Sequence, residues 1–181
     1  ATKEMIAIAC QHQPRYVTLV PEKRKELTTE AGLHLEKTDI NHLRSAIIQL
    51  REHGCIVSLF IDPDKKAVDL SRELGAQAVE IHTGEFANRF ERTKTTKEQL
   101  TLLKPLQDIT AHGASLDLQV HIGHGINYQN ARWIQQLAHV EEANIGHAIM
   151  ARAFFVGLQK AVKEMKELLN NPIYNPLKIM N

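Results

Sequence analysis

Short apolar segments that alternate with longer segments of helical periodicity constrain the fold of this 181-residue chain most strongly. In the longer segments, apolar residues recur three and four positions apart, as on one face of a helix. Strands that alternate with helices form βα units, whose strands pair in parallel, so we expect an α/β fold. The predicted strands lie at residues 16–20, 56–61, 78–82, 116–122 and, more weakly, 143–145.

The predicted helices have residues that mark their ends. Asp62 and Pro63 have the types expected at an N-cap and in a first turn, and Gly75 is expected to end the helix that they begin. A further helix is predicted over residues 96–111, where Pro105 should kink or split it. A long last helix is predicted from an apolar stripe of Phe154, Leu158, Ala161, Met165 and Leu168.

Polar side chains recur on one face of the predicted strands, and this alternation bears on the kind of sheet. An open, doubly wound sheet has helices on both faces and is normally apolar on both. A TIM-type (β/α)8 barrel explains the polar face as its interior, with aliphatic residues under the helices. The alternative is that some strands lie at a sheet edge with one solvated face. The side chains expected inside a barrel are Thr18, Ser58, Glu80, His82, Gln119 and His121.

Composition and charge exclude several classes of partner. The chain is 43% apolar and carries 22 Lys and Arg against 21 Asp and Glu, which is typical of a globular domain without a broad field for nucleic acid or membrane. Its apolar runs are too short for a membrane span. Cys10 and Cys55 lack metal-ligand spacing, so we expect reduced structural thiols and a cytoplasmic protein.

Two Ile-Gly-His triplets end the last two predicted strands, at residues 122–124 and 145–147. In a (β/α) barrel, the loops after the last two strands commonly bind phosphate. Glycine lets backbone N–H groups approach an oxyanion, and a helix N-terminus adds a favourable dipole. The residues that fit this role are Gly123, Gly125 and Gly146, with His124 and His147 beside the ligand.

Glu80 is the other candidate for function. A carboxylate that faces a partly enclosed interior is costly unless it is paired, hydrated or used in catalysis. A structural ion pair, with Arg152 for example, therefore stays open beside a functional role. A metal site at His121 and His124 is disfavoured, because the two side chains diverge at a strand end and no third ligand follows at a usual spacing.

Five segments, in their order along the chain, resemble the pyridoxine 5'-phosphate synthase family: LVPEKRKELTTEAGL, VSLFIDPD, VEIHTG, GHGINYQN and NIGHAIMARAFFVGL. The resemblance implies a TIM-type barrel and a transferase-class, ring-forming enzyme of deoxyxylulose-dependent vitamin B6 biosynthesis. Such enzymes condense 3-amino-2-oxopropyl phosphate with 1-deoxy-D-xylulose 5-phosphate to give pyridoxine 5'-phosphate, phosphate and water. No metal or organic cofactor is implied, and a cytoplasmic homo-oligomer, up to an octamer, is expected.

The resemblance also implies roles for single residues. His124 matches the family's proton donor, and Glu80 matches the glutamate that stabilises the transition state. Where the family usually has Asn-Ala before Gly-His-Gly, this chain has His121 and Ile122, a change that could retune His124. The residues that match substrate contacts are Gly125, Gly146 and His147 for the aminoketone phosphate and Thr28 for the deoxyxylulose phosphate.

The five predicted strands correspond to strands 4 to 8 of a barrel that typically takes about 250 residues. Residues 1–169 are expected to form this C-terminal part of the synthase domain, followed by an irregular tail at 170–181. Because the family's first three strands carry further catalytic residues, we expect the chain to be inactive alone. Two alternatives stay open: a non-catalytic, phosphate-binding partial barrel, and a different sugar-phosphate barrel enzyme.

Overall fold

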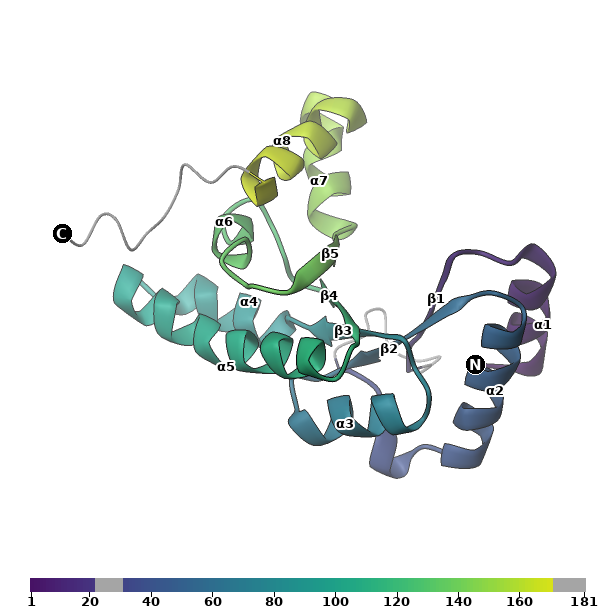
Figure 1. Cartoon of the computed structure of the whole chain (residues 1–181). Coiled ribbons are helices and arrows are strands. Elements are labelled where there is room, and N and C mark those ends of the chain that lie inside the picture. The colour runs from purple at the N-terminus through teal and green to yellow at the C-terminus, as the bar shows by residue number, and fades with distance from the viewer. Residues whose placement is uncertain (22–30, 171–181) are drawn as a thin grey trace.

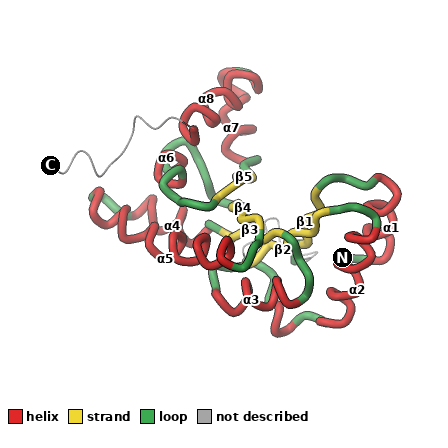
Figure 2. The backbone as a smooth tube through the Cα atoms, viewed as in Figure 1, coloured by secondary structure: helices red, strands yellow, loops and turns green. Residues whose placement is uncertain are grey.

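A computed structural model describes residues 1–21 and 31–170 of the chain (Figure 1). Every strand is followed by at least one helix, so the predicted βα units are present (Figure 2). The elements are α1 (Lys3–His12), β1 (Tyr16–Leu19), the 3-10 helix η1 (Leu35–Lys37), α2 (Ile40–Glu52), β2 (Ile56–Ile61), α3 (Lys65–Glu73), β3 (Ala78–His82), α4 (Gly84–Arg92), α5 (Thr96–Ser115), β4 (Gln119–Gly123), α6 (Ala131–Ile134), β5 (Val140–Asn144), α7 (His147–Val156) and α8 (Leu158–Asn170).

The five strands form one sheet in the order β1-β2-β3-β4-β5, and every neighbouring pair is parallel. A doubly wound sheet would reverse its strand order at a switch point, whereas consecutive parallel neighbours are the arrangement of a barrel wall. The α/β class is therefore confirmed, and the order favours the TIM-type alternative. In this sheet β1 and β5 are the edges.

The strand predictions were accurate for β2 and β3 and displaced for β4 and β5. The predicted fourth strand began too early, because α5 continues to Ser115 and Leu116 is its C-cap. Asp117 then has a left-handed φ of 55°, which ends the helix before the strand can start. The fifth strand was predicted too late, because Val140, Glu141 and Glu142 lack the apolar run that marks the other strands.

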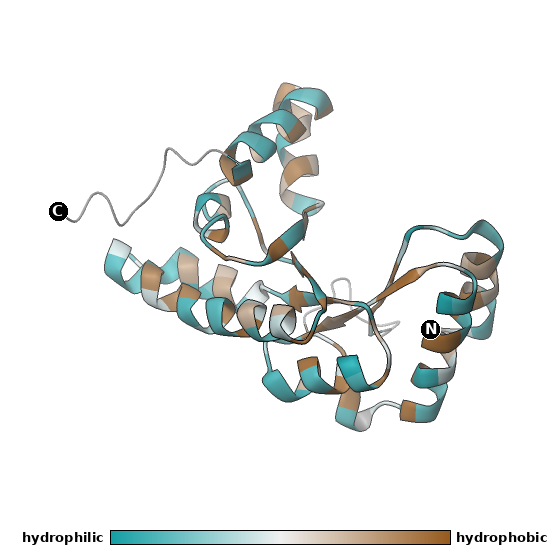
Figure 3. Ribbon diagram, viewed as in Figure 1, coloured by the Kyte–Doolittle hydropathy of each residue, from teal (hydrophilic) through white to brown (hydrophobic). Residues whose placement is uncertain are grey.

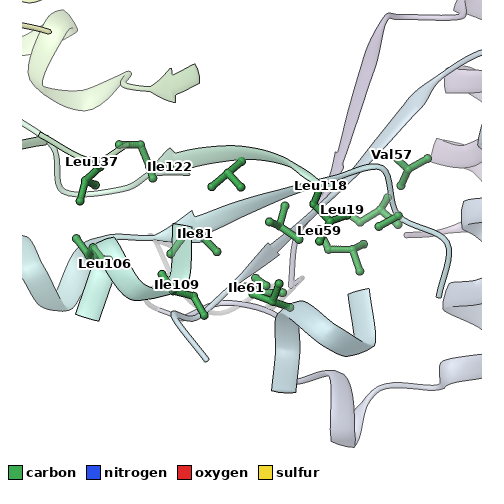
Figure 4. Packing of buried hydrophobic residues seen from close by; sticks show 14 of the residues in the cluster. Leu19, Val57, Leu59, Ile61, Ile81, Leu106, Ile109, Leu118, Ile122 and Leu137 are labelled. Atoms are coloured by element: carbon green, nitrogen blue, oxygen red, sulfur yellow. The ribbon is translucent and has the colours of Figure 1, made fainter. Parts of the chain in front are cut away.

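One face of the sheet carries the core. Aliphatic side chains of β2, β3 and β4 are fully buried against the helices, and Ile81 lies in one cluster with Leu106 and Ile109 of α5 (Figure 4). The helices in turn show alternating apolar and polar stretches (Figure 3). The strand residues with no exposed surface are Val57, Leu59, Ile61, Val79, Ile81, Val120 and Ile122.

The opposite face is polar, as the alternation predicted. Ser58, His82 and His121 are buried there, and Glu80 is half-buried. Strand register brings these side chains into rows across the sheet. One row pairs Glu80 of β3 with His121 of β4. Polar groups from separate strands therefore meet on one side of the sheet.

The prediction that Asp62 and Pro63 begin a helix was wrong. The N-cap of α3 is Asp64, whose carboxylate accepts from the N–H of Ala67 at 3.3 Å. Asp62 instead accepts hydrogen bonds from the N–H of Gly32 and from His82. Asp62 thus lies two residues before the N-cap, and its Oδ1 atom serves these two partners instead.

The predicted helix over residues 96–111 is present as α5, which begins at a capping box of Thr95 and Glu98. Pro105 lies within α5 and does not split it, and the helix keeps a buried apolar face on both sides of the proline. The prediction of one long last helix was wrong. The last helix is not continuous, because Gly157, with a left-handed φ of 82°, separates α7 from α8. The side chain of Phe154, which was placed on the buried stripe, is 87% exposed.

Helix α8 ends at Asn170. Residues 171–181 of the predicted tail lie outside the described residues. Thr28 also lies outside them. None of the helices in residues 1–21 and 31–170 has the length and apolar character needed to cross a bilayer.

Candidate active site at the carboxyl ends of three neighbouring strands

The two Ile-Gly-His triplets lie at the ends of neighbouring strands. Gly123, the glycine of the first triplet, pairs with Asn144 of β5. The second triplet begins at the next residue, Ile145. On the other side of β4, His82 of β3 pairs with Gly123. The ends of β3, β4 and β5 therefore form one continuous surface (Figure 1).

Glu80 reaches across this surface. Its Oε2 atom accepts a hydrogen bond of 2.8 Å from the side-chain amide of Asn144, which lies two strands away. Gly123 makes this possible, because a Cβ atom at that position would overlap Oε1 of Glu80. The alternative ion pair with Arg152 is absent, since the Arg152 guanidinium donates to Glu164 at 2.9 Å.

The surroundings of Glu80 act on its charge in opposite directions. Burial raises the pKa of the Glu80 carboxyl, the amide of Asn144 lowers it, and the negative charge of Glu142 raises it. The net direction is upward. The charged form of this half-buried carboxylate is therefore disfavoured, and a nearby positive charge, such as that of a cationic substrate, would stabilise it.

His124 has an unusual backbone that is held in place from outside. Its φ of 75° is left-handed, a conformation that non-glycine residues adopt rarely. The Thr83 hydroxyl donates to the carbonyl of His124 at 2.6 Å and to that of Gly123 at 2.9 Å. The imidazole packs against that of His82, with ring centroids 4.8 Å apart. The backbone of His124 is therefore held by Thr83, directly after β3, and its ring contacts His82, the last residue of β3.

Replacing Thr83 with valine tests this clamp. The hydroxyl is lost at constant shape, and the fully buried site leaves the carbonyl of His124 without this donor. We expect the free energy of unfolding to fall by about 1–2 kcal/mol, as measured by urea denaturation. Thr101→Val removes an exposed helical hydroxyl and should change it by less than about 0.5 kcal/mol. Equal effects of the two substitutions would contradict the clamp.

The segment after His124 is held by a close approach to α4 and by the side chain of Asn130. Gly125 has a φ of 78°, and a Cβ atom there would lie 2.6 Å from the Cβ of Ala87 in α4. The amide of Asn130 donates to the Gly125 carbonyl at 3.1 Å, while its oxygen accepts from the N–H of Asn127. Glycine is thus required at 125 for both conformation and space.

Gly146 and His147 lie at the start of α7, and both are exposed. Gly146 is the N-cap and makes no side-chain cap, so the first N–H groups of α7 point outward without that partner. No described atom lies within 4 Å of where a Cβ of Gly146 would be. The arrangement leaves room for an anion at this helix N-terminus.

His121 is buried beside Tyr16, whose ring meets it edge-on at 5.2 Å. Burial lowers the pKa of His121, although the charges of Glu142 and Glu141 oppose the shift. The folded protein therefore binds this proton less readily than the unfolded chain, whose histidine has a pKa of about 6.5. Stability from this group is present at neutral pH and is lost as the pH falls below that value.

We expect His121→Asn to flatten this dependence. The free energy of unfolding of the unsubstituted protein should decline between about pH 6.5 and 5 more steeply than that of the variant, because only the former must protonate a buried imidazole. Urea titrations at pH 7.5, 6.0 and 5.0 measure the difference. An unchanged slope would show that His121 does not titrate differently in the folded and unfolded states.

Sequence reasoning selected Glu80, His124, Gly125, Gly146 and His147, and all five lie along this surface. It missed the residues that hold them, namely Asp62, Thr83, Asn130 and Asn144. A polar residue directly after a parallel strand was the available signal for Thr83. Within residues 1–21 and 31–170, no group of three or more His, Cys, Asp or Glu side chains is placed to hold a metal ion.

Comparisons with known proteins agree with the motifs. Residues 1–171 match the family model described as pyridoxal phosphate biosynthesis protein PdxJ. The chain is 43% identical to pyridoxine 5'-phosphate synthase of Blochmanniella floridana, covering 93% of this chain and 66% of that protein. It is 45% identical to the synthase of Synechococcus sp. (strain CC9311), covering 98% and 69%. The chain thus spans about two thirds of the length of these relatives.

A solved structure extends the comparison to the fold. The 3-hexulose-6-phosphate synthase of Salmonella typhimurium superposes with a TM-score of 0.56 over 92% of this chain and 66% of that one, at 20% identity. At this identity the likeness concerns the TIM-barrel-like fold alone. The family match and the identities, which agree with the five motifs, lead to one conclusion: the chain belongs to the PdxJ family of pyridoxal phosphate biosynthesis proteins.

Proposed function

We propose that this chain contributes the acid and the charge-stabilising carboxylate of a pyridoxine 5'-phosphate synthase. The enzyme would join 3-amino-2-oxopropyl phosphate to 1-deoxy-D-xylulose 5-phosphate and release phosphate and water. The names of the relatives support this activity. The observation that carries it is the placement of Glu80 over Gly123, the residue directly before His124. The carboxylate of Glu80 and the imidazole of His124 therefore belong to the same part of the sheet, at the end of β4.

The chemistry needs both groups. An amine that condenses with a ketone passes through an iminium, and each loss of water or phosphate requires a proton for the leaving oxygen. His124 would donate such protons, since an imidazole titrates near neutral pH. Glu80 would face the cationic intermediate and stabilise it electrostatically rather than as a nucleophile.

The substrate phosphates need donors of their own. We assign the aminoketone phosphate to the backbone at Gly125 and to the N-terminus of α7 at Gly146 and His147. The open space around Gly146 and the uncapped first turn support this assignment. Thr28, proposed to contact the second phosphate, lies outside the described residues.

The five strands would be strands 4 to 8 of an eight-stranded barrel, with residues 1–169 as part of its synthase domain. Exposed apolar residues on the helices that flank the two edge strands in the chain support this, namely Met5 and Ile8 of α1, which precedes β1, and Phe154 of α7, which follows β5. Further βα units would cover them. The complete protein would work in the cytoplasm as a homo-oligomer.

The test uses the full-length protein that contains this chain. Incubated with both substrates, it should form pyridoxine 5'-phosphate, identified by mass, together with inorganic phosphate. Binding of a phosphorylated substrate without product would favour the non-catalytic, phosphate-binding alternative. Turnover of another sugar phosphate, with none of this pair, would favour a different barrel enzyme.

A further inference from the structure

Asp62 makes two hydrogen bonds that no cap or core role requires. Its Oδ1 atom accepts from the N–H of Gly32 at 2.9 Å and from Nδ1 of His82 at 3.0 Å. Gly32 packs directly on the backbone of Ile61 and Asp62, where any Cβ would overlap main-chain atoms. The carboxylate is therefore fixed from both sides just beyond the end of β2.

This contact determines the tautomer of His82. A carboxylate can only accept, so Nδ1 of His82 carries the hydrogen and Nε2 of the neutral ring does not. The His82 side chain is only 8% exposed. Its Nε2 is buried and has no hydrogen-bond partner within the described residues. A buried, unpaired ring nitrogen needs an explanation beyond folding.

The unpaired nitrogen faces the gap between His82 and His124. A Cβ atom at Gly84 would lie 2.7 Å from Nε2 of His82 and 3.0 Å from Cδ2 of His124, so the glycine keeps this gap open. The His82 ring also meets the ring of Phe60 edge-on, with centroids 5.2 Å apart. The His82 ring is thus contacted by Asp62, Phe60 and His124, and the planes of the two imidazoles are tilted by 56°.

We infer that Asp62 and His82 are positioning residues for His124, an inference that rests on the proposed function. Asp62 holds His82 in the tautomer whose bare Nε2 faces the gap, and the His82 ring fixes the orientation of the His124 imidazole. The pair therefore serves the proton donor without touching substrate.

Three substitutions in the full-length enzyme test the pair. His82→Asn places an amide donor toward Asp62 but removes the ring against His124. Asp62→Ala removes the oxygen that accepts from both Gly32 and His82. Asp64→Ala, two residues further, removes the carboxylate that caps α3 and is the matched control. We expect kcat to fall about tenfold to a hundredfold for the first two, with KM within about twofold, and no change in kcat for the control.

Nitrogen-15 NMR of the histidine rings in the unsubstituted enzyme gives a second readout that does not depend on activity or on the variants folding. His82 should show a protonated Nδ1 and a bare Nε2. The opposite tautomer, a rise in KM alone, or a kcat unchanged in His82→Asn would each overturn the inference. Absence of product from the unsubstituted enzyme would instead contradict the proposed function, and the tautomer measurement would still decide the placement of the proton.

Discussion

Replacing His124 with asparagine in the full-length enzyme is expected to lower kcat by about 10²- to 10⁴-fold, the range for loss of a positioned general acid. Asparagine suits the test because it tolerates the left-handed backbone that His124 adopts at a φ of 75°. The clamp from Thr83 binds only the carbonyl and is kept. Activity should therefore fall through loss of the imidazole and not through misfolding, as steady-state kinetics and circular dichroism together would report.

The chain supplies a close control for this substitution. His139 also has a left-handed φ, of 69°, but it is exposed and lies in the turn before β5. His139→Asn repeats the same chemical change in the same backbone conformation and should leave kcat within about twofold. If His124→Asn retained the kcat of the unsubstituted enzyme, His124 would not be the proton donor, whatever the family resemblance implies.

The main features of the sheet could be predicted because they depend on local patterns. A two-residue period separated the buried face of β2 and β3 from the face with Glu80 and His82, and the aliphatic members of that pattern are fully buried. The position of the two triplets side by side could also be predicted, because each lies at the end of a strand and the two strands are neighbours. Family motifs suggested the roles proposed for Glu80 and His124, which periodicity alone could not assign.

Contacts between residues distant in sequence could not be predicted in this way. Asp62 followed by Pro63 has the local pattern of a helix start, yet its partners are Gly32 and His82, 30 and 20 positions away. Glu80 reaches Asn144 only because the strand between them has a glycine at the crossing point. Such contacts depend on register across several strands, which one strand's sequence does not contain.

The helical error at the end of the chain has a similar cause. Apolar residues at helical spacing continue through Gly157, so a periodic pattern predicts one helix. Whether a glycine is tolerated within a helix or breaks it depends on what packs on either side. Here α8 buries Ala161 and Met165, whereas α7 has no buried residue in the described structure, and the break separates the two.

Glu80→Gln in the full-length enzyme is the second large effect that we expect. Glutamine keeps the shape of the side chain and an oxygen that can accept from Asn144, so only the negative charge is removed. If Glu80 stabilises an iminium, kcat should fall about 10²- to 10³-fold while KM changes little, because the charge acts on the intermediate more than on bound substrate. Glu91→Gln, on the exposed surface of α4, is the matched control.

The stability of the Glu80→Gln variant should not fall together with its kcat. This difference distinguishes a functional carboxylate from a structural one. The pKa of Glu80 is raised, so the folded protein disfavours its charged form. That cost is absent below the ordinary carboxyl pKa of about 4.3, grows as the pH rises through the folded-state pKa, and is constant above it. Glu80→Gln should thus be at least as stable as the unsubstituted protein at pH 7, by urea denaturation. A less stable variant with normal kcat would make the contact between Glu80 and Asn144 a structural feature and would remove Glu80 from the catalytic proposal.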